Sequence, residues 1–266
     1  MVVIERDSEL ILNKDMINKY EMGSIAYFDI ETTGFDKHEN IIMLISLGSF
    51  TDENNFRIKQ YYAEEKSDEK YVLEAFMEDL KGYDRWCSYN GKAFDEPFIN
   101  NRMIINGIEN FIAPSEHVDL YRMIKPYYKQ LGLARCNLKT VEQYIGINRL
   151  DKIDGGKSVE LYMDYLRSKS EKLRDVIMLH NYEDVLNLPK IFKVVFKIET
   201  GSDFAREDGI TEKQLSYLKY LLDKNNITLE IDYNKVSKKI ASKIIDSLIK
   251  GSCDEKNLLQ MIATNY

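Results

Sequence analysis

Apolar and polar residues alternate along the first part of the chain in stretches short enough for β-strands. Residues 24–30 (SIAYFDI) and 56–63 (FRIKQYYA) predict strands, and residues 41–50 (IIMLISLGSF) form the nearly continuous apolar run that is typical of a buried strand. The turn-rich segment TTGFDKHEN separates the first two runs. We therefore expect these three strands to form an antiparallel meander.

Beyond the meander, the apolar spacing becomes helical, with short strands between the helices. SDEKYVLEAFMEDLKG predicts a helix with Ser67 as its N-cap, and RWCSYNG (85–91) predicts a buried strand. A helix should follow over about 94–106, with Pro97 in its first turn. HVDLYRMI predicts a strand that leads into a helix, and the chain to about residue 198 is mostly helical. This order predicts an α/β fold whose mixed sheet, an antiparallel meander plus parallel strands, is flanked by helices.

A change of pattern after ETGSDFAREDG marks a small helical appendage. Residues 211–223 and 233–250 predict amphipathic helices, and DEKNLLQMIA predicts a third. From Arg206 onward the ten basic residues nearly balance the nine acidic ones, so the acidic excess lies before this region. We therefore expect an N-terminal extension over 1–23, a main domain over 24–200 and a small helical domain over 206–266.

Composition narrows the class of protein. The hydrophobic fraction of 44% is typical of a packed globular chain. The charged N-terminal segment MVVIERDSELILNKD contains no signal-peptide core, and no apolar run reaches the roughly 20 residues that cross a bilayer. The three scattered cysteines, Cys87, Cys136 and Cys253, indicate a reducing compartment. We expect a soluble, cytoplasmic protein with no membrane partner.

Acidic residues interrupt the apolar pattern at three places. Asp29 and Glu31 leave the same face of a predicted strand, where they repel each other. Asp95 begins a helix just after a strand, and His180 and Asp184 lie four residues apart on one helix face. If the four acids converge, they offer the hard oxygen ligands that Mg²⁺ or Mn²⁺ prefers. Two such ions roughly 3.5–4 Å apart stabilise the attacking and leaving oxygens of a phosphoryl displacement.

Three motifs carry a resemblance to a known family. FDIETTG, NGKAFD and HNYED, in this order, resemble the motifs of the DEDD 3′–5′ exonucleases of the RNase-H-like superfamily. NLKTVEQYIGINRLDKIDGG, followed by LHNYEDVLNL, narrows the resemblance to the YprB-type RNase-H-like domain family, over about residues 24–195. The resemblance implies an RNase-H-like exonuclease domain with two divalent cations, Mg²⁺ or Mn²⁺. The implied metal ligands are Asp29, Glu31, Asp95 and Asp184.

The same resemblance implies roles for neighbouring residues. His180 would orient or deprotonate the attacking water, since imidazole titrates near neutral pH. Family patterns place a tyrosine four residues, or a histidine five residues, before the last Asp, whereas here His180 lies four before Asp184. Tyr182 lies only two residues before it, on another helix face, so we favour His180 as the base. The residues implied to lie near the terminal nucleotide are Thr32, Thr33 and Gly34.

Other polar positions leave alternatives open. Asn90 is expected to shape the strand-to-helix turn, with a substrate contact as the second interpretation. Arg149 and Lys152 lie beside a Gly-Gly turn, where a phosphate contact and a solvated loop are equally good interpretations. His117 has no partner at zinc-ligand spacing and is expected at the surface or in a turn.

The net charge of −7 argues against broad nucleic-acid binding through a basic surface, but bound cations would invert the local electrostatics. The leading hypothesis is therefore a metal-dependent 3′–5′ exonuclease that acts on the single-stranded 3′ end of DNA or RNA. The alternatives are a catalytically inactive nucleic-acid-binding module and a structure-selective endonuclease with the same metal site. The C-terminal helices are expected to contact a protein or nucleic-acid partner.

Overall fold

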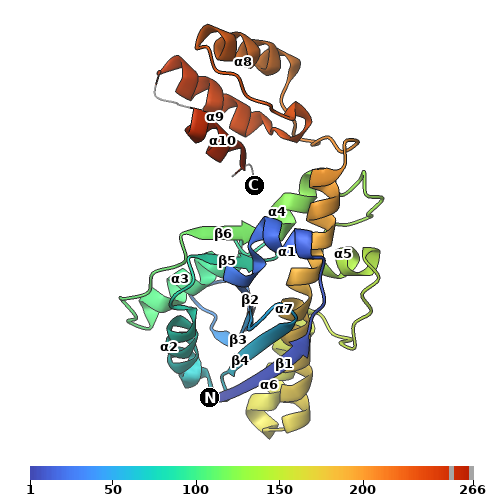
Figure 1. The fold of residues 1–266 in the computed structure, drawn as a ribbon. Helices are drawn as coiled ribbons and strands as arrows, with labels where there is room; N and C mark the ends of the chain where they lie inside the picture. Colours follow the sequence, from blue (N-terminus) through green and yellow to red (C-terminus); the bar gives the residue numbers. More distant parts are fainter. Residues whose placement is uncertain (252–254, 264–266) are drawn as a thin grey trace. The chain divides into compact units, whose positions relative to one another are not determined.

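The computed structural model describes residues 1–251 and 255–263 (Figure 1). The chain packs as two compact units. Met1–Tyr121 and Asn137–Phe196 form the first, and Arg122–Cys136 packs with the described residues from Lys197 onward in the second. The domain boundaries expected from the sequence stay a prediction.

A mixed six-stranded sheet, in the order β1-β4-β3-β2-β5-β6, forms the centre of the first unit. Strands β2, β3 and β4 pair antiparallel, as the meander predicted, while β5 pairs parallel with β2 and with β6. This arrangement confirms the expected fold class. The edge strand β1, which pairs with β4, lies within the segment expected to be an N-terminal extension. The strands are β1 (Val2–Glu9), β2 (Ile25–Thr32), β3 (Ile42–Phe50), β4 (Asn55–Tyr62), β5 (Arg85–Ser88) and β6 (Glu116–Asp119).

Beyond β4, helices follow the positions that the apolar spacing predicted, whereas the helix Lys14–Tyr20 was not predicted. The prediction of Ser67 as an N-cap is wrong, because Ser67 lies inside a short 3₁₀ helix, Lys66–Asp68, where Glu65 and Asp68 form the capping box. The α-helices up to residue 200 are α1 (Lys14–Tyr20), α2 (Glu69–Leu80), α3 (Asp95–Ile105), α4 (Leu120–Ile124), α5 (Leu138–Tyr144), α6 (Gly155–Ser168) and α7 (Glu171–Thr200).

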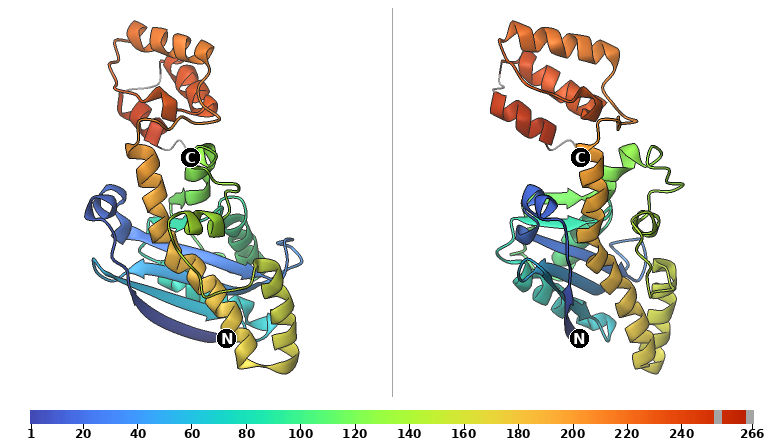
Figure 2. Two further views of the ribbon diagram at one scale, coloured as in Figure 1. Left: turned by 90° about the vertical axis from the view of Figure 1, so that its right-hand side faces the viewer. Right: turned by 45° about the vertical axis from the view of Figure 1, so that its right-hand side comes forward.

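The two faces of the sheet carry different helices (Figures 1 and 2). On one face, α2 and α3 pack over a core that includes Phe28 and Phe76. On the other, α6 and α7 lie side by side and pack on Tyr62 through residues such as Tyr162 and Met178. Because side chains alternate along β2, the face opposite Phe28 is the face toward α7, and the carboxylates of this strand lie there.

Gly48 on β3 explains how closely α7 approaches the sheet. A Cβ atom at Gly48 would lie 2.5 Å from the ring of Phe56 and 2.8 Å from Cγ1 of Val185, closer than real Cβ atoms come. Glycine is therefore required where the helix crosses this strand.

The second unit contains the three helices predicted for the tail, α8 (Glu212–Lys224), α9 (Lys238–Ile249) and α10 (Glu255–Ala263). Their apolar faces form one core, which includes Leu218, Ile244 and Leu258. Cys87 and Cys136 are buried and are not joined in a disulfide, and Cys253 lies outside the described residues. Over the described ranges, no helix combines the length and the apolar character that crossing a membrane requires.

Candidate metal centre

Strand β2 and helix α7 bring three of the predicted residues together. The donor atoms of Glu31, His180 and Asp184 lie within 4.8 Å of one another, and all three side chains are buried. Nε2 of His180 lies 3.5 Å from Oε1 of Glu31 and 3.7 Å from Oδ2 of Asp184. The pairing of β2 with β3 shifts register between Glu31 and Thr32, the kind of irregularity that re-aims side chains beside functional sites.

Asp95 joins this group from the first turn of α3. Its Oδ1 accepts a hydrogen bond from the backbone N–H of Ile30, between the two acids of β2, at 3.3 Å. Asp29 and Asp184 repel each other, and so do Asp29 and Asp95. The structure therefore places the four carboxylates in one cluster, as the sequence spacing predicted.

The cluster carries more negative charge than its surroundings balance. Burial raises the pKa values of Asp29 and Glu31 well above their ordinary range, and repulsion by Asp184 raises them further. Burial also raises the pKa of Asp95. Backbone hydrogen bonds act in the opposite direction, and the resulting pKa is about 7. Four converging carboxylates, of which Asp29, Glu31 and Asp95 have raised pKa values, are a hard-oxygen donor set that fits divalent cations.

A chain of buried amides and a hydroxyl orients Asp29. Asn181 on α7 donates from Nδ2 to Oδ2 of Asp29 at 2.7 Å, and its Oδ1 accepts a hydrogen bond from the hydroxyl of Ser46. Gln60 in turn donates to Oγ of Ser46 at 2.9 Å. Sequence reasoning missed this chain, although the polar Ser46 and Gln60 within apolar strands were the available signal.

Asp151, which sequence reasoning did not single out, holds His180 from behind. Its Oδ2 lies 2.7 Å from Nδ1 of His180, and the carboxylate is almost completely buried. Burial would raise the pKa of Asp151, but hydrogen bonds from His180 and from the backbone N–H of Ile153 lower it to about 2. Glu183 fixes this loop on α7 by accepting hydrogen bonds from the backbone N–H groups of Leu150 and Asp151. No local spacing rule links Asp151 to His180.

Arg149 lies inside the cluster, where neither sequence interpretation placed it. Its guanidinium pairs with Glu142 at 2.6 Å, with Asp151 at 3.3 Å and with Asp184, and its side chain is only 6% exposed. Burial lowers its pKa, but these carboxylates raise it above the ordinary value. Lys152, by contrast, is exposed to solvent.

The predicted turn after β2 is held rigidly. The backbone N–H of Thr33 donates to the carbonyl of Ile41 at 3.0 Å, and the hydroxyl of Thr32 donates to the carbonyl of Gly34 at 2.8 Å. Phe35, which sequence reasoning missed, follows the turn with 92% of its surface exposed, and its ring packs edge-on against Phe94.

Asn90 has the turn-forming geometry expected of it. Its φ angle of 68° is left-handed, and its backbone N–H donates to Oδ1 of Asp119 at 2.9 Å. At the next residue, Gly91, a Cβ atom would lie 2.0 Å from Oγ of Ser88, so the turn requires glycine. These contacts fix the start of α3 and hence the position of Asp95.

Tyr182 and His117 both make hydrogen-bonding contacts outside the carboxylate cluster. The hydroxyl of Tyr182 lies 2.7 Å from Oγ of Ser8 on β1, which agrees with its expected separation from the helix face of His180. The prediction of a surface or turn position for His117 is wrong. Its imidazole is buried between Ser88 and Glu96, at 2.7 Å and 2.6 Å, because the side chain leaves edge strand β6 on the face where it packs against the rings of Phe28 and Trp86.

Comparisons with known proteins agree with this geometry. The family model of the RNase H superfamily matches residues 26–196. The chain belongs to the RNase H superfamily. It is 26% identical over 175 residues to the uncharacterized protein YprB of Bacillus subtilis (strain 168), a match that covers 65% of this chain and 42% of YprB. This similarity confirms the YprB-type RNase-H-like domain.

A second similarity is to a protein named DNA polymerase from Methanocaldococcus jannaschii. The two sequences are 28% identical over 207 residues, and the match covers 67% of this chain and 12% of that protein. The chain thus matches less than half the length of either relative. RNase-H-like nucleases generally use divalent metals, and the carboxylate cluster offers the oxygen donors that such metals prefer.

Proposed function

We propose that this protein is a metal-dependent 3′–5′ exonuclease that hydrolyses phosphodiester bonds at the single-stranded 3′ end of DNA or RNA. The observation that carries the proposal is the convergence of four carboxylates and His180 at the end of β2. The similarity to a protein named DNA polymerase supports nucleic acid as the substrate class.

The four acids, Asp29, Glu31, Asp95 and Asp184, would hold two divalent cations, Mg²⁺ or Mn²⁺. Bound cations would polarise the scissile phosphate and stabilise charge on the attacking and leaving oxygens. The protein supplies the donor set and its orientation. Asn181 holds the carboxylate of Asp29, and the backbone N–H of Ile30 holds that of Asp95. Such supporting hydrogen bonds matter because they fix ligand geometry.

His180 is suited to receive the proton of the attacking water. An ionised Asp151 can only accept hydrogen bonds, so the neutral imidazole carries its proton on Nδ1 and leaves the lone pair of Nε2 toward the carboxylates. The water oxygen then forms a P–O bond while its proton passes to Nε2, and the bond from phosphorus to the 3′-oxygen breaks. Solvent protonates that oxygen, and a nucleoside monophosphate leaves.

The turn Thr32–Gly34 and Lys152 are proposed substrate contacts. The turn is rigid and adjoins the acids, which suits it to position a terminal nucleotide. The exposed Lys152 offers a charge for a phosphate, and such contacts position a strand without reading its sequence. The engaged guanidinium of Arg149 is better suited to support Asp184.

The test uses 5′-labelled single-stranded DNA and matched RNA with Mn²⁺, Mg²⁺ or chelator. We expect a metal-dependent ladder that shortens from the 3′ end, absent from Asp184→Asn and retained in Asp175→Asn, an exposed acid on the same helix. A circular single strand should resist digestion, since an exonuclease requires an end. Cleavage of the circle would replace the exonuclease by an endonuclease, and activity in Asp184→Asn would reject the metal site.

A further inference from the structure

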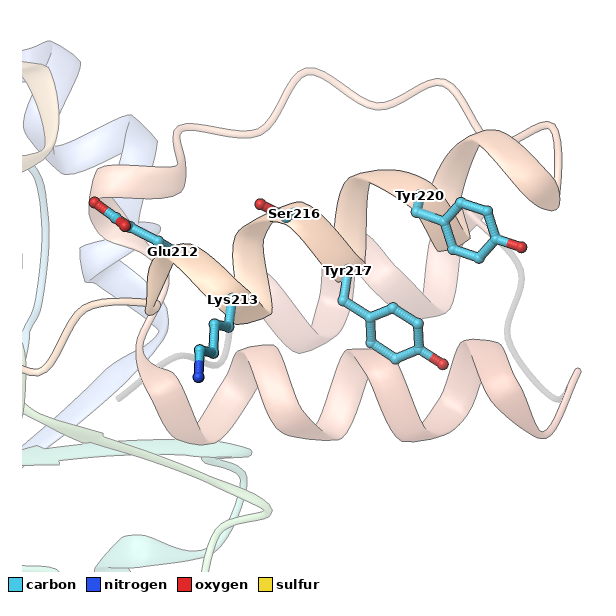
Figure 3. Close-up of a pocket in the computed structure, with 5 residues that line it drawn as sticks. All are labelled: Glu212, Lys213, Ser216, Tyr217 and Tyr220. Atoms are coloured by element: carbon cyan, nitrogen blue, oxygen red, sulfur yellow. The ribbon is translucent and has the colours of Figure 1, made fainter.

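Two exposed tyrosines form a flat aromatic surface on α8 of the second unit. Tyr217 and Tyr220 are 45% and 57% exposed, and their rings are nearly parallel, with an interplanar angle of 13° and centroids 6.3 Å apart. Figure 3 shows both rings leaving the same side of the helix. Neither tyrosine belongs to the core of the unit. Leu218 and Leu222, two residues before and after Tyr220 and therefore on the opposite side of α8 from it, belong to that core.

Positive charge flanks the two rings along the helix. Lys213 lies four residues before Tyr217, and Lys224 lies four residues after Tyr220, so a Lys-Tyr-Tyr-Lys stripe follows one exposed face. Lys213 and both tyrosines line an open depression of about 580 Å³, together with Ser216 and the first-turn acid Glu212 (Figure 3). Lys219, between the tyrosines in sequence, points elsewhere and lies over the ring of Tyr233 at 5.2 Å.

We infer that this stripe, Lys213–Tyr217–Tyr220–Lys224, binds single-stranded nucleic acid. Flat aromatic rings stack on unpaired bases whatever their identity, and flanking lysines track the phosphates. A duplex would not fit, because its bases are already stacked and paired. The lysines at both ends of the stripe complement a phosphate backbone, which favours an anionic strand over an apolar protein segment.

The inference extends the proposed exonuclease function by giving the single strand a second contact on the chain. It concerns binding and not hydrolysis, so it can be measured in chelator, where no metal-dependent cleavage occurs. A failure of the proposed nuclease activity would therefore leave this measurement unaffected.

The experiment measures the fluorescence anisotropy of labelled oligo(dT), and of its duplex with oligo(dA), against the full chain in chelator. We expect Tyr217→Ala/Tyr220→Ala to weaken single-strand binding about ten-fold or more, in line with the stacking energy of each base. Tyr217→Phe/Tyr220→Phe should bind within about two-fold of the wild type, because stacking needs the ring and not the hydroxyl. Tyr71→Ala, which removes a tyrosine 58% exposed on α2, is the matched control and should bind as the wild type does.

A salt titration tests the lysines separately. Each phosphate contact with a single strand contributes about 0.7 to the steepness with which log affinity falls against log salt concentration. The double variant Lys213→Gln/Lys224→Gln should therefore have a slope that is shallower by about 1.4. Lys172→Gln, an exposed lysine on α7, should leave the slope unchanged. Wild-type affinity in the double alanine variant, equal loss in Tyr71→Ala, or preference for the duplex would overturn the inference. Absence of oligo(dT) binding by the wild type would also overturn it and would leave a protein partner as the occupant.

Discussion

Oδ2 of Asp151 lies 2.7 Å from Nδ1 of His180, and both side chains are buried. A neutral imidazole has one donor nitrogen and one acceptor nitrogen, so this contact decides which nitrogen faces the carboxylate cluster. With Nδ1 donating to Asp151, Nε2 presents its lone pair beside Glu31 and Asp184. Asp151, in the loop after α5, thus determines which nitrogen of His180 on α7 can accept a proton.

Asp151→Asn should lower kcat by roughly 10–100-fold, with little change in KM. An amide can donate as well as accept, so it no longer fixes the proton on Nδ1 of the imidazole. The measurement is single-turnover hydrolysis of labelled oligonucleotide across a pH series. The matched control, Asp175→Asn, changes an exposed acid near His180 in sequence and should behave like the wild type. An unchanged kcat in Asp151→Asn would show that the carboxylate plays no part in positioning the base.

The metal-free protein should lose stability as the pH rises from about 4 to about 7. The folded-state pKa of Asp95 is about 7, above the ordinary value near 3.9 for an unfolded chain. Between these values the native state holds a proton that the unfolded state has lost, so the free energy of unfolding falls with increasing pH. Thermal unfolding in chelator measures this, and Asp95→Asn should flatten the dependence. A stability that rises over this range in the wild type would contradict the raised pKa.

Mg²⁺ or Mn²⁺ should raise the unfolding temperature at neutral pH and release protons on binding. The ligands bind metal as carboxylates, so any protons held by Asp29, Glu31 and Asp95 must leave. Titration calorimetry in buffers of different ionisation enthalpy counts these protons, and Asp175→Asn provides the control. Metal binding without proton release at pH 7 would mean that the acids are already ionised in the free protein.

The meander, the four acids and His180 follow from local patterns: strand alternation places Asp29 and Glu31 on one face, and helical spacing aligns His180 with Asp184. The supporting contacts do not follow from such patterns. Asp151 reaches His180 across 29 positions of sequence, and Asn181 reaches Asp29 across 152. These pairings depend on how the loop after α5 and helix α7 pack, which no spacing rule specifies.

Substitutions of Arg149 and Lys152 should have different effects, because Arg149 is a buried structural cation and Lys152 is an exposed, proposed substrate contact. Arg149→Met removes the partner of Glu142 and Asp184, and breaking such buried pairs costs about 3–5 kcal/mol in the free energy of unfolding. Lys152→Gln changes an exposed residue and should alter that free energy by less than about 0.5 kcal/mol while raising KM. Denaturant unfolding and steady-state kinetics provide the two readouts. Equal stability losses would show that Lys152 is structural, and an unchanged KM would remove it from the substrate contacts.

Phe35→Ala should raise KM about ten-fold or more with little effect on kcat or on unfolding temperature. The ring follows the rigid Thr32–Gly34 turn, is 92% exposed and packs edge-on against Phe94, so it can stack on a terminal base. Because an exposed ring contributes little to the core, the loss should appear in binding alone. Steady-state kinetics on labelled single strands test this, with Phe35→Tyr expected to retain the wild-type KM and Ile112→Ala, 88% exposed, as the surface control. If Phe35→Ala kept the wild-type KM, its exposure would reflect only the shape of the turn. If Ile112→Ala raised KM equally, general surface hydrophobicity would replace stacking as the cause.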